Sequence, residues 1–319
     1  MRIAAIGAGG TGGYFGAQLQ RSGQDVAFVA RGAHLAAMRT EGLRVESAVA
    51  DPFALRVRAT DNPAEIGPVD LVLFTVKSYD TATAARLVPS LIGKDTAVVT
   101  LQNGVDNVDV LVETVGARQV MGGLCRIFST IASPGVIRQT GGPRSVTFGE
   151  LEGEMSDRAG AILEVFRGAE IPTELSRQIL VDMWEKYVFI TAQGGMTALT
   201  RLPIGQILAT PETREMYLDA ASEVAAVGRA HGVPIPPGER ERVLKFAQAL
   251  EPGLYSSLHH DLTHGNRMEV EALPGNVVRL GRRYDVPTPV CRAIYAALLP
   301  HDLAARKAKG QAPGGLAPS

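Results

Sequence analysis

The chain has 319 residues, a length that suits two domains better than one. Hydrophobic residues make up 45% of it and charged residues 20%, which is the composition of an ordinary globular protein and excludes a disordered or fibrous one. The formal net charge is −1, so there is no excess of the lysine and arginine with which proteins bind nucleic acids or anionic membranes.

The cysteines and the N-terminal residues indicate in which cellular compartment the protein is expected. Cys125 and Cys291 lie far apart and belong to no C-x-x-C motif, which excludes a disulfide scaffold and a cysteine-based zinc module and is typical of a reducing compartment. From Met1 the chain passes into a short apolar run that ends at Gly7, without the pattern of a signal peptide. No charge-free apolar stretch approaches about 18–20 residues. We therefore expect no membrane span and a cytoplasmic protein.

The first half of the chain alternates short apolar runs with helical patterns, which is typical of a parallel sheet covered on both faces. The predicted strands are 3–6, 26–30, 71–76, 98–101 and 120–124, and the predicted helices are 11–21, 32–40 and 81–91. Two more β-like segments, 135–139 and 146–149, are joined through Gly141-Gly142-Pro143 and predict a hairpin or an extension at the edge of the sheet.

From about Ser176 onward the pattern changes to long amphipathic helices, separated by glycine and proline. They are predicted at residues 179–200, 212–231, 239–250, 268–283 and 289–299. We therefore predict an α/β fold in which a doubly wound domain, residues 1–172, precedes an all-α domain, residues 173–305. Residues 306–319 are rich in alanine, glycine, proline and lysine and predict a flexible tail.

The first predicted strand leads directly into Gly7-Ala8-Gly9-Gly10-Thr11-Gly12, a G-x-G-x-x-G motif. Between a strand and a helix, Gly7 allows the tight turn, Gly9 lets the backbone approach a pyrophosphate, and Gly12 permits close packing of helix on strand. The amides of Gly10 and Thr11 at the new helix N-terminus then point at phosphate oxygens. A glycine turn that serves packing alone is the alternative, but it does not explain these three offsets.

Arg31 follows the second predicted strand, where the adenosine ribose of a dinucleotide should lie. An NAD enzyme places Asp or Glu there to bind the 2′-hydroxyl, whereas an arginine pairs with the 2′-phosphate of NADPH and stacks on adenine. Arg31 therefore favours NADPH over NADH as cofactor. The alternative is a solvated arginine on the surface.

Two further predicted strands end in polar residues at the edge of the sheet where open α/β sheets bind ligands. Lys77 follows the strand at 71–76, and Asn103 follows the strand at 98–101. Lys77 is a candidate contact to a cofactor phosphate or ribose, and Asn103 to the nicotinamide ribose or the substrate. Asn-Gly is also a common turn sequence, so a structural role for Asn103 is left open.

Lys186 is the last charged residue before an uncharged helical run that extends to Thr200. A cation at the edge of an apolar segment is partly desolvated, which favours release of its proton. Because hydride transfer to a carbonyl leaves an oxygen that needs a proton, Lys186 is a candidate proton donor. The alternative is a lysine whose stem covers apolar surface while its ammonium reaches water.

Ser256-Ser257, Asp261 and Glu269 form a second polar group in the helical half. In a helix that begins near Met268, the buried stripe leaves Glu269 on the flank, where a carboxylate can bind a substrate hydroxyl or orient the lysine. The alternative is a solvated charge. Pro274 lies inside this helix and predicts a kink, because proline has no amide N–H to donate.

His260 and His264 have the i, i+4 spacing of a zinc-binding H-E-x-x-H helix, with Asp261 in place of the glutamate. The shorter acid, the poor helix formers at 263–265 and the absence of a third ligand in the sequence argue against it. We therefore predict no metal site, and expect these histidines at a loop or helix edge.

Taken together, these residues resemble the ketopantoate reductase (2-dehydropantoate 2-reductase) family over residues 1–299. The segments that carry the resemblance are Gly7-x-Gly9-x-x-Gly12 with Arg31, Lys77, Gln102-Asn103-Gly104, Trp184-Glu185-Lys186, Ser256-Ser257-x3-Asp261, Glu269-x-Glu271, and Gly281 with Val286-Pro287-Thr288-Pro289-Val290. The resemblance implies a Rossmann domain, a helical domain like that of 6-phosphogluconate dehydrogenase, and NADPH as cofactor.

The resemblance also implies roles for single residues. Lys186 is the implied general acid, Glu269 the substrate-binding glutamate, Ser257 a ligand of the substrate carboxylate, and Asn103 a contact to cofactor and substrate. The implied enzyme is an NADP-dependent oxidoreductase that acts on CH–OH groups and reduces 2-dehydropantoate to (R)-pantoate in pantothenate biosynthesis. The expected partner is the small 2-oxo acid, with no nucleic acid and no membrane, and a homodimer is left open.

Four positions depart from the family pattern. Ile190 and Gly194 stand where well-known members carry asparagines that bind the substrate, Pro274 stands at a position that is often Asn, and Asp80 replaces a common Gln. The first two make the substrate pocket more apolar and roomier, while discrimination for a polar substrate depends on paired polar groups. A reductase of a bulkier or less polar 2-oxo acid is therefore an alternative, and a module that senses NADPH without turnover is another.

Overall fold

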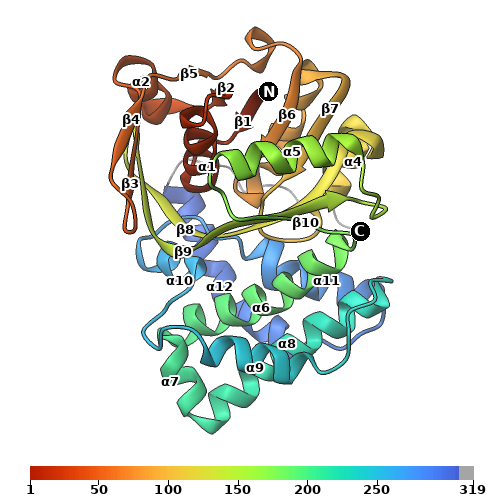
Figure 1. The fold of residues 1–319 in the computed structure, drawn as a ribbon. Coiled ribbons are helices and arrows are strands. Elements are labelled where there is room, and N and C mark those ends of the chain that lie inside the picture. Colours follow the sequence, from red (N-terminus) through yellow and green to blue (C-terminus); the bar gives the residue numbers. More distant parts are fainter. Residues whose placement is uncertain (309–319) are drawn as a thin grey trace. The chain divides into compact units, whose positions relative to one another are not determined.

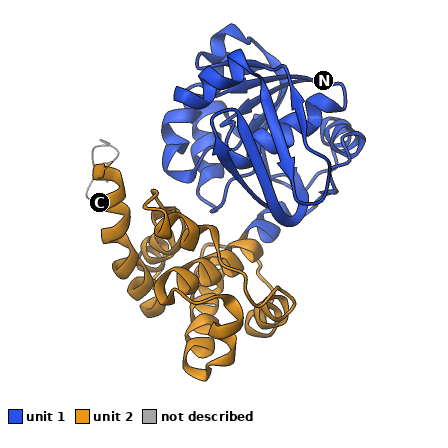
Figure 2. Cartoon of the chain, turned by 90° about the vertical axis from the view of Figure 1, so that its left-hand side faces the viewer, with its two compact units in different colours: residues 1–183 blue, residues 184–319 orange. Residues whose placement is uncertain are grey.

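The computed structural model describes residues 1–308 (Figure 1). The chain divides into two compact units, which we call unit 1, Met1–Met183, and unit 2, from Trp184 on (Figure 2). Unit 1 contains the sheet, whereas the described part of unit 2 is helical. The predicted combination of a Rossmann domain with an all-α domain is confirmed.

A ten-stranded sheet forms the centre of unit 1, in the order β4-β3-β9-β8-β7-β6-β1-β2-β5, with β10 beside β9. The strands are β1 Arg2–Ile6, β2 Asp25–Val29, β3 Leu43–Ser47, β4 Phe53–Leu55, β5 Arg58–Thr60, β6 Val69–Phe74, β7 Ile92–Thr100, β8 Val120–Ser133, β9 Val136–Glu150 and β10 Thr173–Leu175. From β8 to β5 all neighbours are parallel. The carboxyl ends of β7, β6, β1 and β2 therefore lie side by side at one edge.

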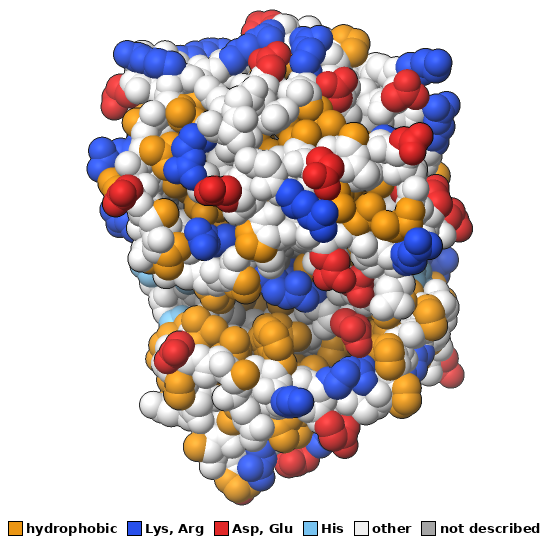
Figure 3. All heavy atoms as spheres, viewed as in Figure 1, with side chains coloured by type: hydrophobic (Ala, Val, Ile, Leu, Met, Phe, Trp, Pro, Cys, Tyr) orange, Lys and Arg blue, Asp and Glu red, His pale blue; other side chains and the backbone are white. Residues whose placement is uncertain are grey.

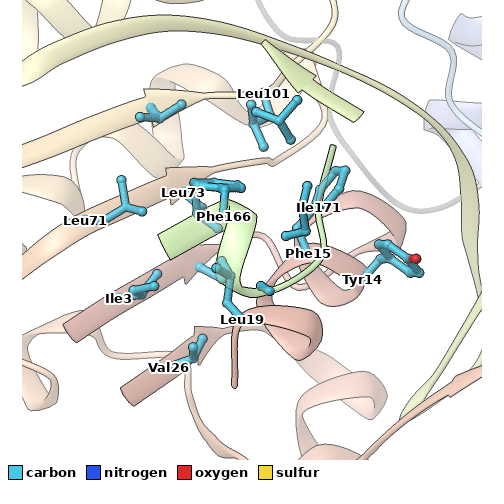
Figure 4. Close-up of a cluster of buried hydrophobic side chains, with 14 of the residues drawn as sticks. Ile3, Tyr14, Phe15, Leu19, Val26, Leu71, Leu73, Leu101, Phe166 and Ile171 are labelled. Carbon is cyan, nitrogen blue, oxygen red and sulfur yellow. The ribbon is translucent and has the colours of Figure 1, made fainter. Parts of the chain in front are cut away.

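Helices cover both faces of these parallel strands, as their nearly continuous apolar runs predict. Those of unit 1 are α1 Gly10–Arg21, α2 Gly32–Thr40, α3 Thr81–Ala85, α4 Asn107–Val115 and α5 Asp157–Gly168, and α6 Ile179–Thr200 leads into unit 2. Because successive side chains of a strand point to opposite faces, Ile3 lies in an apolar cluster with Phe15 of α1 and Phe166 of α5 (Figure 4), whereas Ile6 lies in another with Leu111 of α4.

The predicted hairpin is wrong in its connection. Segments 135–139 and 146–149 belong to one strand, β9, which pairs antiparallel with β8. The turn lies between Ser133 and Val136, at Gly135, whose φ is 77°. Gly141-Gly142-Pro143 falls inside β9, near a shift in register opposite Phe128. Glycine and proline here mark an irregularity in a long strand, a role they also play at strand interiors.

Unit 2 is built from the rest of α6 and six further helices in its described part. They are α7 Ile204–Ala209, α8 Pro211–Ala230, α9 Glu239–Gln248, α10 Ser257–Thr263, α11 Asn276–Arg283 and α12 Pro289–Ala308, with a π-helical turn, η5 Glu271–Gly275, before α11. Helix α12 runs through residues 306–308 of the predicted tail, and Arg306 within it binds the buried carboxylate of Asp302 at 2.6 Å. The remainder of that tail lies outside the described residues.

Two observations concern the surface. Among residues 1–308, no helix combines the length and apolar character that crossing a membrane requires. On the face seen in Figure 3, basic and acidic side chains alternate, in keeping with the net charge of −1. That face offers no extended patch of one sign of the kind that attracts nucleic acid.

Candidate functional site

The glycine loop lies at the carboxyl end of β1, between β2 and β6. Gly7 has a φ of 95°, and its N–H donates to the carbonyl oxygen of Val29 at 3.1 Å. A Cβ added to Gly7 would lie 2.7 Å from the backbone nitrogen of Val76, so a side chain fits neither the conformation nor the space. Thr75 Oγ1 donates to the carbonyl oxygen of Gly7 at 2.8 Å and holds the turn from the other side.

The three other glycines of this loop differ in what surrounds them. A Cβ on Gly12 would lie 2.2 Å from Thr75 Oγ1, and a Cβ on Gly10 would lie 2.1 Å from the carbonyl oxygen of Ser129. Both glycines therefore serve close packing of α1. A Cβ on Gly9 would meet no atom within 4 Å. Gly9 is thus the position where the loop backbone is open to a ligand.

Helix α1 begins at Gly10, and no side chain caps its N-terminus. Amides of the first helical turn, including that of the half-buried Thr11, have no partner within the helix and carry the positive end of its dipole. An open glycine beside uncapped amides is the arrangement that binds the pyrophosphate of a dinucleotide. The loop present here therefore fits such a cofactor.

His34 of α2 holds this loop and was not found from the sequence. Its Nδ1 accepts the N–H of Gly135 at 3.0 Å, so the proton lies on Nε2, which donates to the carbonyl oxygen of Ala8 at 2.9 Å. One neutral imidazole thus connects the glycine loop to the turn between β8 and β9. A histidine in a helix carries no sequence signal of this role, since both partners are backbone atoms.

We expect this contact to give unit 1 a pH dependence. Burial lowers the pKa of His34 below 6.5, and its hydrogen bond to Ala8 acts in the opposite direction. As the pH falls, His34 is therefore protonated in the unfolded chain before it is protonated in the folded one. The stabilisation of the fold by the neutral imidazole is complete above pH 6.5 and is lost as the pH falls below it. Urea unfolding at pH 7.5 and pH 5.5 should show His34→Gln to be destabilising chiefly at the higher pH.

The exposed His301 on α12 provides the control for this measurement. His301→Gln should change the free energy of unfolding little and equally at both pH values. A destabilisation by His34→Gln that grows as the pH falls would contradict the neutral imidazole.

Arg31 lies between β2 and α2, at the predicted edge of the sheet. Its guanidinium Nη2 forms an ion pair with Oδ2 of Asp80, which follows β6. The Arg31 side chain is 74% exposed and that of Asp80 is 23% exposed. Arg31 is therefore at the surface, as the solvated alternative has it, but in contact with an acid at the ligand edge.

Lys77 and Asn103 follow β6 and β7, and a buried network joins their two loops. The Gln102 amide donates to the Val76 carbonyl at 2.9 Å and to Thr81 Oγ1 at 2.8 Å. Thr81 donates in turn to Asn107 Oδ1 at 2.8 Å, and the amide of Asn107 donates to the backbone carbonyl of Asn103 at 2.8 Å. The backbone of Asn103 is thereby fixed, and its half-buried side chain lies at the same edge as the glycine loop.

Lys186 lies within α6 and is half-buried. Glu185 before it forms an ion pair with Arg242 at 3.3 Å. Tyr187 after it is 1% exposed, and its hydroxyl lies 2.7 Å from the carbonyl oxygen of Leu273. These contacts fix the rotation of α6 about its axis, and with it the direction in which Lys186 leaves the helix.

Glu269 is not on a helix flank, because the helix predicted from Met268 does not begin there. The π-helical turn starts at Glu271, and α11 follows it. Pro274 causes this irregularity: it has no N–H, so Gly275 donates to the carbonyl oxygen of Val270 at 2.8 Å instead. Glu269 is only 5% exposed, so the alternative of a solvated charge is wrong.

The backbone on either side of Glu269 is anchored. The N–H of Met268 donates at 2.8 Å to Asp302, a fully buried carboxylate that also binds Arg306. The carbonyl oxygen of Glu269 itself accepts the N–H of Leu273 at 3.0 Å. These hydrogen bonds fix the backbone from which the buried carboxylate extends, and a fixed attachment point favours substrate recognition.

Ser257 is the first residue of α10 and is exposed. The preceding Ser256 caps this helix by accepting the N–H of His259 at 3.1 Å, and its hydroxyl lies 2.6 Å from Thr197 Oγ1 of α6. Further along α6, a Cβ on Gly194 would meet Leu258 of α10 at 3.7 Å. Helix α10 is therefore fixed against α6, and Ser257 with it.

Lys186, Ser257 and Glu269 thus come from three segments of unit 2 that pack together. Helix α6 also packs on η5, since a Cβ added to Gly194 would lie 3.9 Å from the side chain of Leu273. An ammonium, a hydroxyl and a buried carboxylate in one unit can bind a polyfunctional anion and transfer a proton.

The histidines in and just after α10 make local contacts. The rings of His260 and His264 lie 4.0 Å apart, and Nδ1 of His264 donates to the carbonyl oxygen of His260 at 2.8 Å. His259 stacks on Tyr255 at 4.1 Å. Within residues 1–308 no three His, Cys, Asp or Glu side chains come together in a way that could hold a metal ion.

Comparison with known families covers both units. The family model described as "Ketopantoate reductase PanE/ApbA" matches residues 3–153, and "Ketopantoate reductase PanE/ApbA C terminal" matches residues 178–301. The chain belongs to the ketopantoate reductase family. The resemblance found in the sequence is thereby confirmed, and this ketopantoate reductase family member is an oxidoreductase with a fold that binds a nicotinamide cofactor.

Single proteins extend the comparison. The 2-dehydropantoate 2-reductase of Mesorhizobium japonicum is 31% identical over 317 residues, covering 93% of this chain and 96% of that protein. The crystal structure of a PanE/ApbA family ketopantoate reductase from Ralstonia eutropha JMP134 has a TM-score of 0.86 at 30% identity and covers 96% of this chain and 100% of that one. A D-mandelate dehydrogenase solved with NADH and anilino(oxo)acetate, 21% identical, shares the fold with a TM-score of 0.86, covering 96% and 99%.

Proposed function

We propose that the protein reduces a 2-oxo acid to a 2-hydroxy acid with NADPH, and that the substrate is 2-dehydropantoate, which gives (R)-pantoate. The observation that carries this proposal is the placement of Lys186, Ser257 and Glu269 on three packed segments of a ketopantoate reductase domain. In unit 1, an open glycine loop, Arg31 and Asn103 lie at the ends of neighbouring strands.

The cofactor is held by the residues at the carboxyl ends of β1, β2, β6 and β7. The amides of Gly10 and Thr11 bind its pyrophosphate at the start of α1. Lys77 binds a phosphate or ribose of the cofactor, and Asn103 binds the nicotinamide ribose with the support of the Gln102 network. When bound, NADPH supplies the hydride that reduces the carbonyl carbon of the substrate.

Lys186 completes the reduction. As the carbon–oxygen double bond becomes a single bond, the oxygen gains negative charge, and the Lys186 ammonium stabilises that charge and donates a proton to form the hydroxyl. The neutral amine then regains a proton from water. Because Tyr187 fixes α6 beside it, Lys186 needs little reorganisation to act.

Glu269 and Ser257 orient the substrate. The buried Glu269 carboxylate accepts a hydrogen bond from the substrate hydroxyl, and the exposed Ser257 hydroxyl donates to the substrate carboxylate. Asn103 fixes the relation of cofactor to substrate. These contacts favour a hydroxylated 2-oxo acid over a plain one, since the plain acid offers Glu269 no hydroxyl to bind.

Arg31 tests the choice of cofactor. Arg31→Ala is expected to raise the KM for NADPH about tenfold, because the 2′-phosphate loses a charged partner, and the KM for NADH by less than about twofold. Steady-state rates with each cofactor measure both values. Equal effects on the two cofactors would contradict the contact between Arg31 and the 2′-phosphate.

A second candidate substrate is a bulkier or less polar 2-oxo acid. Gly194 lies against Leu258 and Leu273, so the side of α6 that follows Lys186 and Ile190 is apolar. The D-mandelate dehydrogenase with the same fold was solved with anilino(oxo)acetate. NADPH oxidation with 2-dehydropantoate and with branched and aromatic 2-oxo acids separates these substrates by kcat/KM.

The same assay tests the proposal as a whole. A kcat/KM for 2-dehydropantoate at least tenfold above those of the branched and aromatic acids would support the first substrate. Tight NADPH binding without oxidation by any of these acids would contradict catalysis and favour a sensing module. We place the activity in the cytoplasm, because both cysteines, Cys125 and Cys291, are free and buried, as a reducing compartment allows.

A further inference from the structure

The ion pair of Arg31 with Asp80 lies where the cofactor's 2′-phosphate would bind. The two residues are 49 positions apart in the sequence. They meet because their strands, β2 and β6, have only β1 between them in the sheet. Asp80 ends the short helix η2 (Ser78–Asp80), and its N–H donates to the carbonyl oxygen of Lys77 at 2.8 Å. Asp80 is thus the anchored partner, and the exposed Arg31 extends to it.

An acid at this place affects the two nicotinamide cofactors in opposite ways. The 2′-phosphate of NADPH must share Arg31 with the Asp80 carboxylate and then lies beside a like charge. NADH carries a 2′-hydroxyl instead, which repels no carboxylate and can donate a hydrogen bond to one. Asp80 therefore costs affinity for NADPH and costs none for NADH.

We propose that Asp80 sets the cofactor preference of this protein by neutralising Arg31, so that the margin of NADPH over NADH is much smaller than Arg31 alone would give. This inference rests on the proposed function, in which Arg31 binds the 2′-phosphate. It adds a specificity-determining residue that recognises neither the substrate nor the nicotinamide.

The test is the binding of each cofactor to Asp80→Asn, which keeps the shape of the side chain and removes its charge. Titration of the full-length protein, followed by cofactor fluorescence, gives Kd for NADPH and for NADH. We expect the Kd for NADPH to fall about tenfold at low ionic strength and the Kd for NADH to stay constant or rise. In 0.5 M salt the gain should shrink to about twofold, because exposed charges are screened.

A second arginine–aspartate ion pair in unit 1 supplies the matched control. Arg39 of α2 pairs with Asp61 at 3.2 Å, and the two side chains are 49% and 66% exposed. Asp61→Asn removes the same charge from the same region of unit 1. It should leave the ratio of the two Kd values unchanged, which would exclude a general effect of net charge.

Two outcomes separate this inference from the proposed function. If Arg31→Ala weakens NADPH selectively while Asp80→Asn leaves the Kd ratio unaltered, the inference is wrong and the proposed cofactor stands. If Arg31→Ala affects both cofactors equally, the proposed 2′-phosphate contact itself is wrong. Asp80→Ala should shift the Kd ratio in the same direction as Asp80→Asn. If the two variants shift this ratio in opposite directions, the inference is also wrong.

Discussion

Lys186→Ala is expected to lower kcat by about 10²–10⁴-fold, the usual contribution of a general acid. The loss follows because the developing alkoxide finds neither a cation nor a proton at the place that α6 fixes. The Kd for NADPH should change by less than about twofold, since the residues proposed to bind it lie in unit 1. Single-turnover reduction of the 2-oxo acid, together with a cofactor titration, measures both.

Two further variants make this prediction sharper. Lys186→Arg keeps the positive charge but cannot release a proton at neutral pH, so its kcat should stay far below that of the wild type. Lys245→Ala removes an exposed lysine from α9 and should leave kcat unchanged. A Lys186→Ala enzyme that turns over within about twofold of the wild type would refute proton donation by this residue.

Gly9→Ala and Gly12→Ala should separate binding of the cofactor from folding. Gly9 has an extended backbone and open space where its Cβ would lie, so Gly9→Ala should fold with an unchanged Tm. Its Cβ would stand where the pyrophosphate approaches the loop, so the Kd for NADPH should rise at least about tenfold, or about 1.4 kcal/mol. Thermal unfolding without cofactor and a cofactor titration test the two halves of this prediction.

Gly12→Ala, in contrast, should first lower the stability of the fold. Its Cβ would lie 2.2 Å from Thr75 Oγ1 and 2.3 Å from the carbonyl oxygen of Gly7, and the second contact is with backbone that cannot rotate away. We expect a loss of about 1–3 kcal/mol in the free energy of unfolding, as for other overpacked positions. If Gly12→Ala unfolds like the wild type, or if Gly9→Ala is the less stable variant, the assignment of Gly12 to packing and of Gly9 to cofactor access is wrong.

Local pattern predicted most of the regular elements. The apolar runs at β1, β2, β6 and β7 are buried on both faces, so they lack the alternation of an exposed strand and stand out in the sequence. Helix α6 was predicted with its observed bounds, because its apolar residues continue for many turns. By contrast, β3, β4 and β5 are short strands at the sides of the sheet, and too few residues carry their pattern.

Among the polar residues of the candidate site, some could be located from the sequence and others could not. Arg31, Lys77 and Asn103 follow apolar strands, and a residue just after a parallel strand is at the ligand edge whatever the rest of the fold does. The burial of Glu269 depends on Pro274, which turns the expected helix into a π-helical turn. That outcome is decided by which carbonyl Gly275 reaches, not by hydrophobic period.

By itself the sequence determined the two kinds of domain, the glycine loop after β1 and the family, because strand runs, helix periods and G-x-G-x-x-G are all local patterns read along the chain. Only the tertiary structure decided that His34 holds the loop and that Asp80 meets Arg31. The physical reason is that such pairs depend on the order of strands in the sheet, which brings together residues whose own neighbours in the sequence carry no trace of the contact.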